Sequence, residues 1–159
     1  MNLTITTLLT INVRLTLAQE QSESVAGQPV LIHSQKLVVV ILESRDQLMA
    51  YSMTTYTWSK IPISDKADQK IIPTVSSSMA ACLLGQSIYA YSSVAGKWAE
   101  LKFPEDINTR YEIGIDRVNA VSKTDSINQF FVFGINNGAW SDVDLNNGKI
   151  LEVKPQKQE

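Results

Sequence analysis

Apolar and polar residues alternate over three stretches of the chain, centred on residues 38–61, 79–103 and 130–153. A period of two is typical of half-buried strands, and helical spacing is scarce. Polar connectors separate the stretches, with residues 64–70 as one example. The pattern therefore predicts an all-β protein with little helix.

Two of these stretches align with each other at an offset of 40 residues. Residues 48–52 (LMAYS) match residues 88–92 (IYAYS). In each copy a tyrosine is followed seven positions later by a tryptophan, which gives the pairs Tyr51/Trp58 and Tyr91/Trp98. Such self-similarity indicates a repeated structural unit.

A third copy aligns with the second at an offset of 52, which places residues 148–153 on residues 96–101. Gly96 and Gly148 lie where turns between strands favour positive φ. We therefore expect one domain over residues 30–156, made of three antiparallel blade-like repeats at about 30–70, 71–117 and 118–156. Since a closed propeller needs at least four blades, three repeats predict a partial or open propeller-like fold.

The Tyr–x6–Trp spacing followed by Leu or Ile and Pro resembles kelch-type β-propeller repeats, with Glu43-Ser44 and Leu83-Leu84 standing where that family has a diglycine. The third unit, ending in the Asn-Gly-Lys turn at residues 147–149, is more similar to propeller repeats of quinoprotein dehydrogenases. Both resemblances imply four-stranded blades. Neither specifies a function, because propellers host many unrelated activities.

Residues 1–18 have two interpretations. They resemble a signal peptide, with an apolar middle and a small-x-small site before Gln19, and they also alternate as an edge strand would. The Ala-Gln-Glu junction slightly favours export to the periplasm or outside the cell over a cytoplasmic location. Residues 19–29 form a polar linker in either case.

Composition excludes several classes of protein. The chain has 159 residues and a net charge of −2, which argues against a nucleic-acid partner. No apolar run is long enough to span a membrane as a helix. Cys82 is the only cysteine, so no internal disulfide can form.

Few residues are candidates for chemistry, and we predict no catalytic site, no metal site and no cofactor. His33 is the only histidine and has no identifiable partners, and Cys82 lies in an apolar run typical of a buried thiol. Residues 142–148 superficially resemble a calcium loop, but Asn147 and Val153 stand where glycine and glutamate are needed. Asp142 and Asp144 are therefore interpreted as outward positions of a strand.

The aromatic residues divide into two groups. The repeated pairs Tyr51/Trp58 and Tyr91/Trp98 are predicted to pack in the core, because a structural repeat repeats its core contacts. Trp140 lies outside the repeated position in this alignment and is the one candidate for an exposed ligand-binding aromatic residue.

A repeat architecture without catalytic groups favours a non-enzymatic protein-interaction or scaffold module. Two alternatives remain: a carbohydrate-binding or hydrolytic module whose loops carry the site, and an inactive fragment of a longer propeller. Because a blade-like unit needs a neighbour on each face, we expect a protein partner or self-association.

Overall fold

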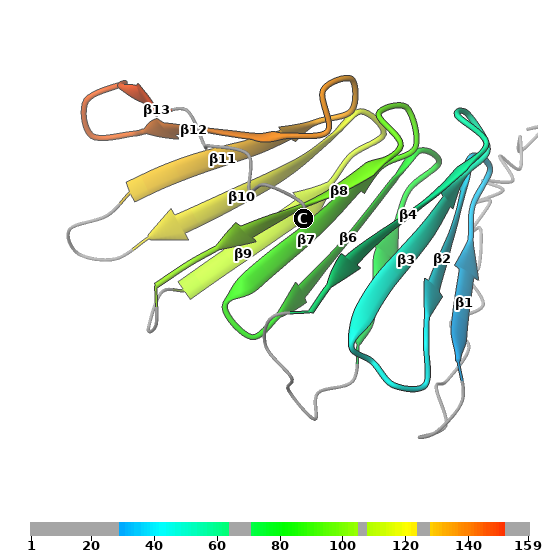
Figure 1. Ribbon diagram of the computed structural model, residues 1–159. Helices are drawn as coiled ribbons and strands as arrows, with labels where there is room; N and C mark the ends of the chain where they lie inside the picture. The colour runs from blue at the N-terminus through cyan, green and yellow to red at the C-terminus, as the bar shows by residue number, and fades with distance from the viewer. Residues whose placement is uncertain (1–28, 64–70, 105–107, 124–127, 152–159) are drawn as a thin grey trace, which may run out of the picture.

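The computed structural model describes residues 29–63, 71–104, 108–123 and 128–151 (Figure 1). These residues form strands and turns and contain no helix. The all-β prediction is therefore confirmed. The interpretation of residues 1–18 and that of residues 19–29, apart from Pro29, fall outside the described residues.

The strands form three antiparallel sheets, each built from consecutive strands of the chain. The first sheet contains β1 (Val30–His33), β2 (Leu37–Ile41), β3 (Gln47–Ser52) and β4 (Thr57–Pro62). The second contains β5 (Thr74–Val75), β6 (Met79–Leu84), β7 (Ser87–Ser92) and β8 (Lys97–Lys102). The third contains β9 (Asn108–Ile113), β10 (Arg117–Lys123), β11 (Asn128–Gly134), β12 (Trp140–Asp144) and β13 (Ile150–Leu151).

The sheets stack in chain order, and two apolar clusters join them. One cluster combines alternate residues of the first sheet, such as Leu37 and Leu48, with Tyr91 and Trp98 of the second. The other combines the opposite side of the second sheet with the third. The second sheet is therefore covered on both faces, as the nearly continuous burial of β6 and β7 shows. The fanned, open stack agrees with the predicted blade-like repeats (Figure 1).

The third repeat differs from its predicted alignment. Phe133 pairs with Trp140 across β11 and β12, as Tyr91 pairs with Trp98 across β7 and β8. The counterpart of Trp98 is thus Trp140, and the offset of 52 that placed Trp98 on Ile150 is wrong. In addition, β9 hydrogen bonds to β10 in the third sheet, although the sequence placed its residues in the second unit.

Candidate interaction surface

One aromatic pair recurs at the same place in all three sheets. The ring centroids lie 5.3 Å apart in Tyr51–Trp58, 5.1 Å apart in Tyr91–Trp98 and 5.4 Å apart in Phe133–Trp140. Each pair joins directly opposite residues of neighbouring strands. The strand pairing holds the two rings of each pair side by side. Tilted rings at this separation also attract each other, in addition to the free energy gained by burying their surface.

The environment of the pair differs between sheets. Trp98 packs against the first sheet and is 2% exposed, and Trp140 packs against the second and is 4% exposed. Trp58 is 57% exposed, because its side of the first sheet has no described sheet against it. The prediction of core packing is therefore confirmed for Trp98 and wrong for Trp58.

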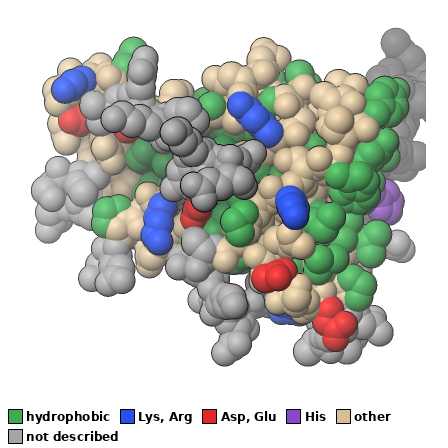
Figure 2. All heavy atoms as spheres, in the orientation of Figure 1, with side chains coloured by type: hydrophobic (Ala, Val, Ile, Leu, Met, Phe, Trp, Pro, Cys, Tyr) green, Lys and Arg blue, Asp and Glu red, His purple; other side chains and the backbone are tan. Residues whose placement is uncertain are grey.

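Trp58 belongs to a larger surface on the outer side of the first sheet. Directly paired residues share a face of a sheet, so two rows of side chains project from this side. We define the open aromatic face as these two rows: His33, Val38, Tyr51 and Trp58, and Leu31, Val40, Met49 and Lys60. Figure 2 shows hydrophobic side chains gathered beside the single histidine, over the end of the stack that β1 to β4 form.

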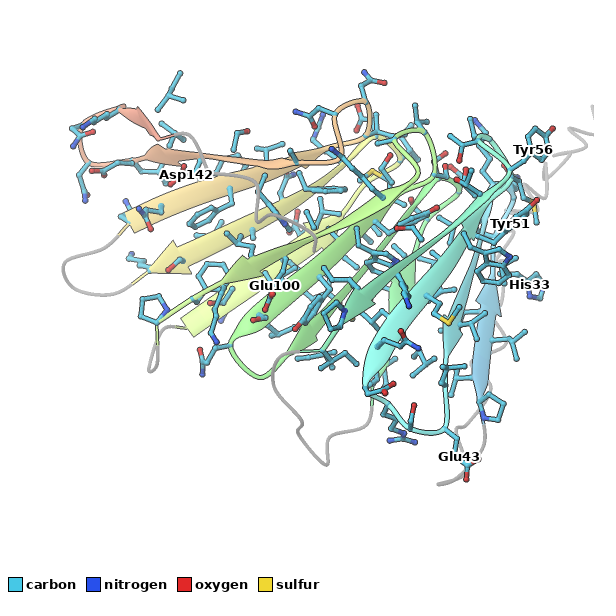
Figure 3. All side chains as sticks on the ribbon, in the orientation of Figure 1. His33, Glu43, Tyr51, Tyr56, Glu100 and Asp142 are labelled. Atoms are coloured by element: carbon cyan, nitrogen blue, oxygen red, sulfur yellow. The ribbon has the colours of Figure 1, made fainter. Side chains whose placement is uncertain are left out.

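The turn between β3 and β4 extends this surface. Met53 is 42% exposed and Tyr56 is 77% exposed, and Figure 3 shows Tyr56 at the same end of the molecule as Tyr51 and His33. Tyr56 has a φ of 58°, and the same place in the next two turns holds Gly96 and Gly138. A large side chain occupies a left-handed position for which the other repeats use glycine, at a cost of about 1 kcal/mol.

The open aromatic face is apolar with a basic margin. Six of its eight members, as defined above, are aliphatic, aromatic or thioether residues, and none is acidic. His33 on β1 and Lys60 on β4 are both exposed, and these strands are the two edges of the first sheet. His33 is thus a surface residue of an edge strand, and no metal-ligating cluster is found among the described residues.

Trp140 does not have the environment that its candidate role requires. It is buried between the second and third sheets, and its indole N–H donates a hydrogen bond to the Ala99 carbonyl at 3.4 Å. The expectation of an exposed Trp140 is wrong. The seven-residue spacing from Phe133, with Gly138 two residues before the tryptophan as Gly96 is before Trp98, would have identified the repeat.

Cys82 lies in the core between the first and second sheets. Burial raises the pKa of its thiol to about 12. Because only the thiolate is a good nucleophile, this cysteine is a packing residue.

The calcium-like segment forms a strand and a turn. The Asp144 carboxylate accepts hydrogen bonds from the Asn146 N–H at 2.8 Å and the Asn147 side-chain amide at 2.7 Å. Asp142 is 8% exposed, so its interpretation as an outward residue is wrong. Burial raises the pKa of its carboxyl, an effect that a backbone hydrogen bond partly opposes.

Comparison with known proteins returned no matching family model and no matching curated protein. Among the described residues, no helix is long and apolar enough to cross a membrane. The geometry itself therefore carries the functional argument, and the open aromatic face is its most distinctive feature.

Proposed function

We propose that the protein is a non-enzymatic interaction module that binds another protein through the open aromatic face. Its open stack of antiparallel sheets is compatible with the blade repeats that kelch and related propellers use. One observation carries the proposal: an aromatic pair that is buried in the second and third sheets recurs with the same geometry on the outer side of the first sheet, where Trp58 is exposed. Exposed apolar surface of this kind marks interaction sites in soluble proteins.

The composition of the face supports a protein partner. Tyrosine and tryptophan dominate the energetics of protein interfaces, because they bury a large area with little loss of side-chain freedom. Tyr51 and Trp58 are already held in one arrangement by the strands they lie on. Binding therefore requires little further ordering, which favours affinity.

Site-specific cross-linking tests the proposal. A photoreactive residue at Leu31, which is 59% exposed on the face, should cross-link to protein in the native host cell. Trp58→Lys should reduce that yield at least about tenfold, since removal of a central aromatic anchor has this effect on an interface.

Ile72→Lys is the matched control. Ile72 is 50% exposed, precedes β5 of the second sheet and is not a member of the open aromatic face. It should leave the yield unchanged. If the Trp58 variant folds and cross-links as well as the native chain, the face is not an interaction surface.

A further inference from the structure

The two internal interfaces of the stack are built to the same plan. In each, one sheet contributes aliphatic residues, and the next contributes the aromatic pair. A serine hydroxyl adds a polar contact at one end: Ser52 donates to the Ser93 carbonyl, and Ser92 donates to the Ile135 carbonyl. A complete interface of this type therefore needs an aliphatic face and an aromatic face.

Among the described residues, one sheet face of each kind has no other sheet packed against it. The open aromatic face is the first. The second is the outer side of the third sheet, where strand register places Phe130 in line with Leu48 and Ile88, and Val143 in line with Ile61 and Leu101. We define the open aliphatic face as the mainly aliphatic, apolar members of this side: Val121, Phe130, Val132, Val143 and Leu145. Asn119 and Ser141 pair with Val132 on the same side and add polar groups to it.

Members of the open aliphatic face remain accessible. Val121 is 39% exposed and Leu145 is 49% exposed, and Phe130, Val132 and Val143 are half-buried. The corresponding residues of the first and second sheets, Leu48 and Ile88, are fully buried. The stack therefore ends on one aromatic and one mainly aliphatic surface, as its internal interfaces require, although Gly134 stands in the third sheet where Ser52 and Ser92 donate their hydrogen bonds.

One position of the third sheet carries a charged residue where the other two sheets carry an apolar one, and this difference suits an interface between separate chains. Arg117 occupies the position that Leu37 and Met79 fill in the first and second sheets, at the end where the serine hydroxyl of those sheets meets the next turn. That end lies beside the aromatic pair of the following sheet. The same stacking would bring Arg117 of one copy close to Tyr51 and Trp58 of another, and a guanidinium is attracted to the face of such rings.

Resting on the proposed function, we propose that the partner on the open aromatic face is a second copy of this chain. The open aliphatic face of each copy packs on the open aromatic face of the other, head to tail. Two copies then bring together six sheets, within the range in which blades close into a ring. Such heterologous contacts form closed rings when the rotation per chain allows it.

Light scattering on the full chain at micromolar concentration tests the assembly. The expected mass is twice the chain mass of 17.7 kDa. Trp58→Lys on one face and Val121→Lys on the other should each give monomers, with a dissociation constant raised at least about tenfold. Ile72→Lys should remain a dimer. Circular dichroism and thermal unfolding establish that each variant is folded.

Mixing the two monomeric variants distinguishes head-to-tail from face-to-face pairing. The Val121 variant retains an intact aromatic face and the Trp58 variant an intact aliphatic face, so the mixture should form dimers through one native interface. A dimer that Val121→Lys leaves unchanged would show aromatic face on aromatic face and would overturn the proposal. Masses above two copies would contradict ring closure.

A monomeric native chain would also overturn the second-copy proposal. If deletion of residues 1–28 then increased binding of a hydrophobic dye, the chain's own N-terminal segment would be the occupant. If Trp58-dependent cross-linking to another protein persisted, the proposed function would stand with a different partner. If the native chain were monomeric, the deletion did not change dye binding and no Trp58-dependent cross-link formed, the open aromatic face would not be an interaction surface.

Discussion

The tryptophan of the repeated aromatic pair occupies the same position in each sheet but changes in its environment. Trp98 is enclosed between two sheets, whereas Trp58 faces outward. The free energy that each ring contributes to folding should follow this difference, because burial rather than sequence position determines it.

We expect Trp98→Ala to lower the free energy of unfolding by about 3–5 kcal/mol, through lost burial and the cavity left behind. Trp58→Ala should lower it by less than about 1 kcal/mol when measured on the monomer. Urea unfolding of both variants, at a protein concentration too low for self-association, measures the two free-energy changes. Similar losses for both would contradict the difference in burial.

Tyr56 offers a second residue-scale prediction. Because its left-handed backbone suits glycine and its side chain is largely exposed, Tyr56→Gly should stabilise the monomer by about 1 kcal/mol. Gly96→Ala is the converse change, since a Cβ there would lie 2.9 Å from the Thr55 hydroxyl oxygen, and it should destabilise. Denaturant midpoints measure both, and a destabilised Tyr56→Gly variant would show that the Tyr56 side chain makes compensating contacts.

Asp142 should make stability depend on pH. Burial raises the pKa of its carboxyl above the value in the unfolded chain, so the folded state holds this proton more tightly. The stabilisation is present below the unfolded value of about 4 and is lost as pH rises through the folded value.

Asp142→Asn replaces the buried carboxyl by a group that does not ionise, so the variant does not lose stability as pH rises. The substitution should therefore raise the free energy of unfolding more at pH 7 than at pH 3.5. Urea unfolding at the two pH values measures the difference. The exposed Asp116→Asn is the control. An equal effect of Asp142→Asn at both pH values would contradict a buried carboxylate.

At the scale of elements, the turn after β12 is complete without a metal ion. Both oxygens of the Asp144 carboxylate accept hydrogen bonds within the turn, and the Asn147 side-chain oxygen accepts the Lys149 N–H. We predict that millimolar calcium leaves the melting temperature unchanged, because an ion specific to the folded state would raise it. A rise that Asp144→Ala abolishes would contradict this prediction.

Strands and their repetition were predictable, but one alignment was not. The period of two identifies β3 and β7, and the Tyr–x6–Trp spacing relates them. In the third sheet phenylalanine replaces the tyrosine, and the turn at Gly148 has the same positive-φ glycine as the turn at Gly96. Matching the turn rather than the aromatic spacing moved the alignment by one strand and concealed the role of Trp140.

At the scale of the whole molecule, stability should be highest in the middle of the stack. The strands β6 and β7 are covered on both faces, while β1 forms an outer edge. Because β13 is likewise an edge strand of an end sheet, hydrogen exchange of the monomeric Trp58→Lys variant should be slowest in β6 and β7 and fastest in β1 and β13. Uniform protection across the three sheets would mean that they unfold as a single unit.

The open aromatic face could not be located from the sequence, because exposure depends on which sheets are neighbours. Tyr51 and Trp58 satisfy the same local pattern as Tyr91 and Trp98, and only the stacking order separates them. A sequence repeat shows which residues the copies have in common. Whether a given copy is buried or exposed depends on its position in the folded stack.

The stacking order also determines what the chain presents during its synthesis. The first sheet leaves the ribosome before the second, yet among the described residues Leu37, Val39 and Leu48 on its inner side pack against residues of the second sheet such as Trp98. At typical elongation rates, the roughly forty intervening residues take about 2–8 s. For those seconds the nascent sheet has apolar residues on both sides, which makes it a substrate for chaperones that act at the ribosomal exit.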